Sequence, residues 1–235
     1  MSDEVPLELT DDMLAAAPAQ ADTRIDLEQG MSYAPRVTLT LIALCVVVFG
    51  WEVATGALAN SAAIIGAGAL SRERVLAGEV WRLATPMVLH GGFGHLFGNC
   101  LALYTLGVAL EHTVGWARTG GLFVGSGIVA SLTSLASGPG PSVGASGAIF
   151  GMMGALIVIL YRYRSVLRLR DNRVIVVLVA WSGYTLFTGL FTPYVDNAAH
   201  VGGLVAGALL ASPLRPELLT GRPVTNDLHR WREAI

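Results

Sequence analysis

Apolar residues gather into six long segments along the chain, separated by polar links. A helix that crosses a bilayer needs about 20 mostly apolar residues, within a range of about 17–25. The last five segments are also rich in Gly, Ala and Ser, which suits close helix packing in lipid. The pattern therefore predicts an all-α membrane protein with six transmembrane helices. We expect them at about 37–57, 95–115, 116–137, 146–163, 174–194 and 197–212.

A long connection at about 58–94 joins the first two segments. Its apolar stretch SAAIIGAGAL is too short and too rich in Gly for a membrane span. Its end, EVWRLATPMVLHGGFGH, mixes aromatic residues with Pro, Gly and His, which suggests an interfacial structure. A loop of this length in a compact protein is usually functional or has structure of its own.

Composition narrows the class of protein. Of 235 residues, 53% are hydrophobic and 14% charged, against about 25% charge in soluble domains. These numbers exclude a typical soluble enzyme, a disordered chain and a nucleic-acid binder. The net charge of −2 conceals an acidic head, because residues 1–36 hold eight acidic residues and two Arg. We interpret 1–36 as a disordered cytoplasmic tail, and it lacks the basic start of a cleavable signal peptide.

The basic residues, all of them Arg, indicate the orientation. Twelve of the fifteen fall on one side of the membrane if both termini are cytoplasmic, as the excess of positive charge in cytoplasmic loops favours. Only Arg72, Arg74 and Arg82 fall outside, all in the first loop. A cytoplasmic tail at 213–235 completes the expected topology. The absence of Lys and of an organelle-targeting presequence favours a bacterial plasma membrane.

Four polar residues stand at membrane depth, where such groups are costly and by default functional. They are His95, Asn99, Ser146 and His200. In the expected topology the second, fourth and sixth segments start on the outer side. His95, Ser146 and His200 each lie within about the first four residues of one of them. Three helices thus bring these side chains to one level near the outer face. A neutral imidazole in reach of a hydroxyl is the minimum machinery for nucleophilic catalysis.

Each of these residues alone also has a structural interpretation. His95 and Asn99, four apart on one helix face, either join helices or aim two donors at a developing oxyanion. Ser146 lies in a G-x-S-G run that is equally a packing motif, and a lone intramembrane His200 is equally a proton-relay residue. Cys45 and Cys100 lie in apolar segments and are interpreted as small buried hydrophobes. We expect no metal and no cofactor.

Glycines spaced four apart favour contact between the two helices that carry the Ser and the second His. Gly147 and Gly151 follow the Ser, and Gly203 and Gly207 follow the His. Two glycine faces let helices approach until the side chains meet.

Four short motifs occur in a fixed order along the chain. They are WR at Trp81 and Arg82, H-x4-H-x3-N at His90, His95 and Asn99, G-x-S-G at Gly144, Ser146 and Gly147, and A-H-x-x-G-x-x-x-G at Ala199, His200, Gly203 and Gly207. Together these motifs resemble those of the rhomboid family of intramembrane serine proteases, over about 37–212. Glu111, at the cytoplasmic end of the second segment, also matches an acidic position common in that family.

The resemblance implies a six-helix bundle around a water-filled cavity that opens to the outside. Ser146 would be the nucleophile and His200 the general base. The oxyanion hole would consist of the side chains of His95 and Asn99 and the backbone N–H of Ser146. His90 would be an accessory residue at the cavity mouth.

The resemblance also implies a membrane-embedded first loop at 58–94, stabilised by Trp81 and Arg82. Several family members carry a Tyr stacked on the catalytic His where this chain has Phe150, so we expect ring packing without the phenol and modest tuning of His200. No third member of a triad is evident. Asp196, four residues before His200, is interpreted as a helix cap.

The predicted function is that of a serine endopeptidase that cleaves transmembrane segments of membrane proteins within the lipid bilayer. Its partners are such substrates, helix-destabilised and with small residues at the cleavage point, and not nucleic acid. One rival is a rhomboid-like protein that binds membrane helices without cutting them, which would require Ser146 or His200 to be missing. The other is a small proton-linked transporter, which inverted repeats would support; the two halves show no convincing symmetry.

Overall fold

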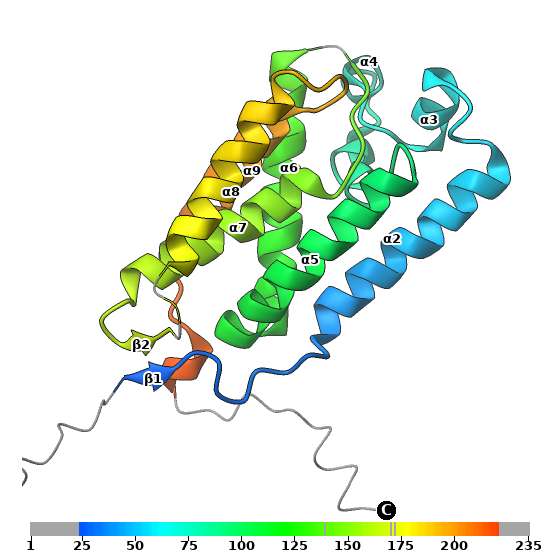
Figure 1. The fold of residues 1–235 in the computed structure, drawn as a ribbon. Coiled ribbons are helices and arrows are strands. Elements are labelled where there is room, and N and C mark those ends of the chain that lie inside the picture. Colours follow the sequence, from blue (N-terminus) through cyan, green and yellow to red (C-terminus); the bar gives the residue numbers. More distant parts are fainter. Residues whose placement is uncertain (1–23, 139, 170, 172, 221–235) are drawn as a thin grey trace, which may run out of the picture.

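The computed structural model describes residues 24–138, 140–169, 171 and 173–220. In this part of the chain, helices of 15–22 residues lie alongside one another as a bundle (Figure 1). Their positions follow the predicted apolar segments closely. They are α2 (Arg36–Thr55), α5 (Phe93–Val114), α6 (Trp116–Ser137), α7 (Ser146–Arg162), α8 (Val174–Gly189) and α9 (Asn197–Ala211).

Helix α7 lies at the centre of the bundle. Most of its residues are buried, and its most extensive contacts are with α9 and then α6. Helix α2 is the opposite case, because its apolar surface faces outward and it buries only Thr38, Cys45 and Glu52. A helix that is apolar all round but little buried by protein is typical of a lipid-facing span. Both cysteines are free, as expected, although Cys100 is only half-buried.

The predicted approach of two glycine faces is confirmed between α7 and α9. A Cβ on Gly203 would collide with the carbonyl oxygen of Gly147. A Cβ on Gly207 would likewise collide with the carbonyl oxygen of Gly151. The backbones of the two helices therefore touch directly, which brings the first turns of α7 and α9 together.

The first loop has structure of its own, as its length predicted. It contains two short helices and two 3₁₀ turns at one end of the bundle (Figure 1). They are α3 (Ser61–Ala67), α4 (Arg72–Leu76), η1 (Val80–Leu83) and η2 (Thr85–Val88).

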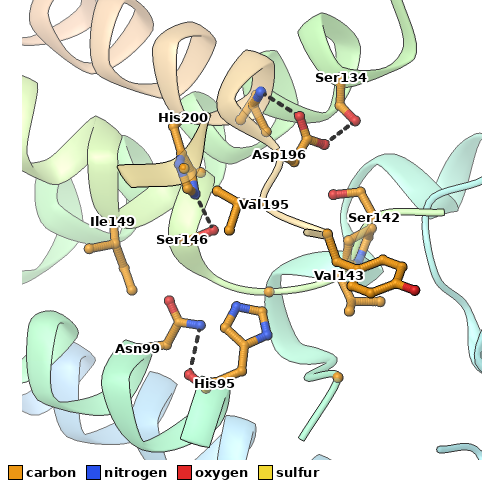
Figure 2. A pocket seen from close by; sticks show the side chains of 18 of the residues that line it. His95, Asn99, Ser134, Ser142, Val143, Ser146, Ile149, Val195, Asp196 and His200 are labelled. Carbon is orange, nitrogen blue, oxygen red and sulfur yellow. Dashed lines mark hydrogen bonds between the residues drawn. The ribbon is translucent and has the colours of Figure 1, made fainter. Parts of the chain in front are cut away.

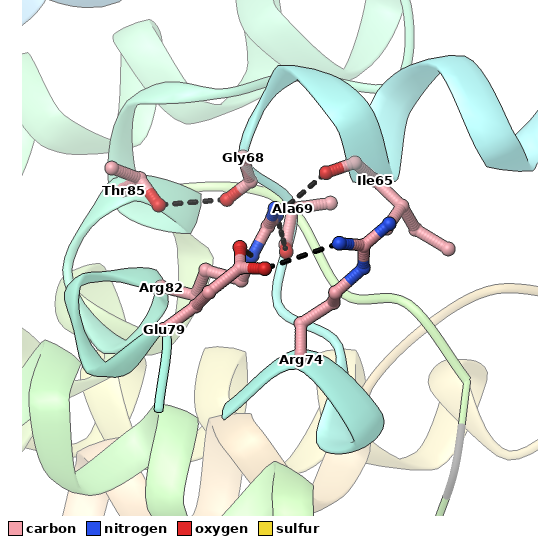
Figure 3. Close-up of polar contacts among 7 residues, drawn as sticks. All are labelled: Ile65, Gly68, Ala69, Arg74, Glu79, Arg82 and Thr85. Carbon is pink, nitrogen blue, oxygen red and sulfur yellow. Dashed lines mark hydrogen bonds and ion pairs between the residues drawn. The ribbon is translucent and has the colours of Figure 1, made fainter. Parts of the chain in front are cut away.

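Arg82 holds this loop together from inside (Figure 3). Its side chain is buried, and its Nε donates to a Glu79 carboxylate oxygen at 2.7 Å. One terminal nitrogen donates to the carbonyl oxygens of Ile65 and Ala69, at 2.5 and 3.0 Å. The guanidinium carbon also lies 4.3 Å from the centre of the Trp81 ring, within cation–π distance. The hydrogen bond from Arg82 lowers the pKa of Glu79 below its ordinary value.

The other end of the bundle corrects the prediction of a disordered head. Two-residue strands β1 (Ile25–Asp26) and β2 (Leu167–Arg168) pair in parallel, and Leu27 is only 6% exposed in the apolar core. Residues 24–35 are therefore ordered, and only residues 1–23 of the predicted tail lie outside the described residues.

The segment after α9 is also packed rather than a free tail. A 3₁₀ turn, η3 (Glu217–Thr220), contacts α5, and Leu214, Leu218 and Leu219 lie against the core. The rest of the predicted C-terminal tail, 221–235, lies outside the described residues.

Helix length separates the bundle into two groups. In the described residues α2, α5 and α6 are long and apolar enough to cross a membrane. Helices α7, α8 and α9 are apolar but shorter, at 17, 16 and 15 residues. Helix α8 ends at Gly189, five residues before the predicted limit at 194. Residues 190–194 form turns and a bend instead of continuing the helix. The count of six spans therefore stays a prediction.

Candidate active site

Ser146 is the first residue of α7, at the end of a segment tied to the first loop. Leu70 and Ser142 exchange backbone hydrogen bonds of 3.0 and 3.1 Å, and the Gly144 N–H donates to the Pro86 carbonyl at 2.8 Å. Gly144 has a φ of +124°, which L side chains rarely adopt. The glycine of the G-x-S-G run is thus required by the turn that leads into the Ser.

His200 lies in the first turn of α9, which Asp196 caps. One Asp196 carboxylate oxygen accepts the Ala199 N–H at 2.9 Å, and the other accepts the Ser134 hydroxyl of α6 (Figure 2). The prediction that Asp196 is a helix cap is confirmed. Sequence reasoning missed Ser134, because its partner lies 62 positions away.

The hydroxyl and the imidazole meet directly. Ser146 Oγ lies 2.8 Å from His200 Nε2, although the two residues are 54 positions apart in the sequence (Figure 2). For Nε2 to accept the hydroxyl proton, Nδ1 must carry the proton of the neutral ring. His200 is 6% exposed, so little water competes for this contact.

The far side of the His200 ring lacks the carboxylate of a triad. Nδ1 is buried and has no hydrogen-bond partner in the described part of the chain. Phe150, one turn after Ser146, stacks on the ring instead, with centroids 4.4 Å apart and planes inclined by 7°. The predicted ring packing is therefore present.

His95 and Asn99 approach the same space from α5. The His95 ring packs on Gly144, where a Cβ would lie only 2.5 Å from its Cε1. Asn99 Nδ2 donates one hydrogen bond to the His95 carbonyl oxygen at 3.0 Å (Figure 2). A side-chain amide has two N–H donors, so the second is left for a ligand in the cavity.

His90 lies behind this layer rather than in it. It is fully buried and does not line the cavity, but its ring meets the His95 ring edge-on with centroids 5.3 Å apart. Its backbone N–H donates to both carboxylate oxygens of Glu52 on α2. Sequence reasoning missed Glu52, although a signal existed: it is the one charged residue in 37–57.

A cavity of about 960 Å³ surrounds the Ser–His contact. Its walls come from the first loop and from α5, α6, α7, α8 and α9, and they include His95, Asn99, Ser146 and His200. Trp81 and Arg82 lie outside it, in the loop. Among the described residues, no three His, Cys, Asp or Glu side chains are grouped as a metal site requires. The arrangement offers a nucleophile, a base and convergent donors, the groups that acyl transfer needs.

Comparison with known proteins places this bundle in a family. A family model described as Rhomboid domain matches residues 77–217, more than half of the chain. The chain therefore belongs to the rhomboid family. The family and the long apolar helices together indicate a membrane protein.

Several relatives carry protease names. The Rhomboid protease GluP of Bacillus subtilis (strain 168) is 36% identical over 181 residues, covering 77% of this chain and 35% of that protein. The Rhomboid protease AarA of Providencia stuartii is 31% identical over 204 residues, 74% of this chain and 71% of that protein. RHOMBOID-like protein 5 of Arabidopsis thaliana is 41% identical over 155 residues, which cover 64% of this chain and 50% of that protein. The chain thus spans half or less of the length of two of these relatives.

Proposed function

We propose that this chain is an intramembrane serine endopeptidase that uses Ser146 as nucleophile and His200 as general base. The observation that carries the proposal is the 2.8 Å contact between Ser146 Oγ and His200 Nε2 inside a cavity that His95 and Asn99 also line. The protease names of the relatives support the same reaction class.

In the proposed reaction, Ser146 Oγ attacks the scissile carbonyl carbon and its proton passes to His200 Nε2. Collapse of the tetrahedral intermediate breaks the C–N bond, and the imidazolium returns the proton to the leaving amine. Water then loses a proton to His200 and attacks the acyl-enzyme. Collapse of the second tetrahedral intermediate breaks the ester C–O bond, and the imidazolium gives its proton to Ser146 Oγ. This step releases a carboxylic acid and restores the Ser146 hydroxyl.

The oxyanion is expected to meet three donors. They are the His95 ring N–H, the second N–H of the Asn99 amide and the backbone N–H of Ser146. The Ser146 N–H lies in the first turn of α7, where backbone donors have no partner within the helix. Helix N-termini also favour negative charge.

The short helices support a buried reaction level in a six-span topology with both termini cytoplasmic. A helix of 17 residues is about 25 Å long, less than the roughly 30 Å of a hydrocarbon core. With its Arg-rich end at the cytoplasmic surface, α7 starts below the outer surface, so Ser146 lies at membrane depth. Substrates are then transmembrane segments that unwind locally in the cavity, in a bacterial plasma membrane.

The test uses purified full-length protein in detergent with a fluorophosphonate probe and in liposomes with a model transmembrane substrate. We expect wild type to label and to cleave, and Ser146→Ala and His200→Ala to do neither. The matched control is Ser142→Ala, which removes another hydroxyl from the same cavity wall. It keeps the backbone bridge to Leu70 and should retain both activities.

Two results would contradict the proposal. One is labelling and cleavage that persist in Ser146→Ala. The other is loss of both activities in Ser142→Ala to the same extent as in Ser146→Ala, because the probe would then report the fold rather than the nucleophile.

A further inference from the structure

A buried carboxylate on α2 holds the backbone beside the site. Glu52 is fully buried, although α2 is the most outward-facing of the long helices. Its two carboxylate oxygens lie 3.1 and 3.2 Å from the backbone nitrogen of His90. In the described part of the chain, the His90 N–H is the hydrogen-bond donor to the Glu52 carboxylate.

Burial of this carboxylate costs more free energy than packing alone would justify. A carboxylate taken out of water costs several kcal/mol unless strong hydrogen bonds compensate, and an apolar residue of similar size would fill the same space. The position of Glu52 on a lipid-facing helix sharpens the contrast, since the rest of 37–57 is uncharged. The carboxylate therefore has a use that a Leu or Met would not serve.

The hydrogen bond leads to the oxyanion side of the site. It fixes the chain at His90, whose ring is fully buried and meets the His95 ring edge-on at 5.3 Å. His95 in turn packs on Gly144, two residues before Ser146. A shift of the His90 backbone is therefore passed by direct contact to the His95 ring.

We propose that Glu52 is a positioning residue that sets the His90–His95 ring pair, and through it the His95 donor opposite Ser146. This rests on the proposed function. Glu52 touches no reacting atom and acts through the loop at His90. A 1 Å displacement of a catalytic donor is enough to cost up to about a hundredfold in rate, so a lost anchor has a measurable effect.

The variants are Glu52→Leu, which removes the acceptor, and Glu52→Gln, whose side-chain carbonyl still accepts one N–H. We expect Glu52→Leu to lower kcat about tenfold with little change in KM, and Glu52→Gln to restore most of it. A purely structural residue would lose stability without this split, so kcat and KM are measured beside the unfolding midpoint.

Glu111→Leu is the matched control. Glu111 of α5 is also a buried carboxylate. It accepts hydrogen bonds from the N–H groups of Val37 and Thr38, at the end of α2 opposite to Glu52. Its loss should destabilise the protein and leave kcat near that of wild type. Equal loss of kcat in Glu111→Leu and Glu52→Leu would overturn the proposal, as would wild-type kcat in Glu52→Leu.

A second measurement does not depend on activity. In protein labelled with ¹³C-histidine, the ring resonances of His90 and His95 should shift in Glu52→Leu, return in Glu52→Gln and stay unchanged in Glu111→Leu. If wild type cleaves nothing, the proposed function fails, while the resonances still decide whether Glu52 positions the rings. Unchanged His95 resonances in Glu52→Leu would overturn the inference whatever the activity.

Discussion

At the scale of single residues, the site differs from a serine triad in the contacts of the His200 ring on the side away from Ser146. His200 Nδ1 has no hydrogen-bond partner in the described residues, and the Phe150 ring is stacked on the imidazole with centroids 4.4 Å apart. Stacking fixes the plane of the ring but adds no charge. Under the proposed mechanism, the imidazolium would lack the hydrogen-bonded carboxylate of a triad, so ring orientation is expected to carry more of the effect.

Replacing Phe150 tests this division. Phe150→Leu removes a stacked pair worth about 0.5–1.5 kcal/mol, so we expect kcat to fall about two- to tenfold. Phe150→Tyr keeps the ring and should stay near wild type. The measurement is the initial cleavage rate in liposomes, with the unfolding midpoint as control. Wild-type kcat in a well-folded Phe150→Leu would show that stacking does not orient the base.

At the scale of elements, the α7–α9 interface sets the geometry of the Ser146–His200 contact. The backbone of each helix fits against glycines of the other, so Ser146 and His200 meet without long side chains. Packing that depends on missing Cβ atoms has little tolerance for added volume. The distance between Ser146 and His200 is therefore a property of the helix pair.

Gly203→Ala should break this pairing. Its Cβ would collide with the Gly147 carbonyl oxygen, and we expect a loss of about 1–3 kcal/mol with reduced fluorophosphonate labelling. Gly183→Ala in α8 is the control, because nothing lies within 4 Å of the added Cβ. Gly183→Ala should have an unfolding midpoint equal to or higher than that of wild type. The unfolding midpoint in detergent measures both, and equal stability of the two variants would contradict the argument.

The first loop carries a pH-dependent contact of its own. Arg82 lowers the pKa of Glu79 from its ordinary value of 4.5, chiefly through their hydrogen bond. Because the folded-state pKa is the lower one, the contribution of this carboxylate to stability is present above pH 4.5. It is lost as the pH falls through the lowered folded-state value.

Glu79→Gln should therefore lower the unfolding midpoint at about pH 7, and this difference should shrink at about pH 3. Arg74, which also contacts Glu79 at 3.2 Å, is exposed and is expected to matter less. Parallel pH profiles for wild type and Glu79→Gln would show that the carboxylate makes no ionic contribution.

At the scale of the whole molecule, the cytoplasmic end in the proposed topology is closed by residues far apart in the chain. Strand β1 pairs with β2 across about 140 positions, and Asp26 lies 2.8 Å from Arg168. Leu27 enters the same core as the residues of α7. The segment before α2 thus ties the α7–α8 link to the rest of the bundle.

Leu27→Ala tests the importance of this closure. Truncating a buried Leu costs about 2–5 kcal/mol, and Leu27 is 6% exposed. Ile25→Ala, in strand β1 two residues earlier, is the control, since Ile25 is 37% exposed and its replacement should cost much less stability. Thermal unfolding in detergent compares them. Equal midpoints for both variants would mean that β1 pairs without supporting the core.

The sequence predicts most of what depends on local pattern and little of what depends on distant partners. Helix starts at 116, 146 and 197 agree with the predicted segments, because apolar runs and caps such as Asp196 are local signals. Pairing of β1 with β2 has no such signal, since two-residue strands are set by their partner. The tail prediction failed at 24–35 for this reason.

The candidate site shows the same division. Ser146, His200, His95 and Asn99 stand out by sequence because polar groups are rare in apolar segments, and the structure brings them to one cavity. Glu52 and Ser134 were missed, since each acts through a residue on another element. His90 was expected at the cavity mouth and lies one layer behind it.

The order of Ser146 and His200 along the chain has a consequence for biosynthesis. A ribosome completes α7 long before α9, because Ser146 precedes His200 by 54 residues. Until α9 enters the membrane, Ser146 lacks the contact with His200 and the α7 glycine face lacks its partner helix. Under the proposed mechanism, an unfinished chain is inert toward its neighbours at the translocon, and proteolytic competence arises only once synthesis of the bundle is complete.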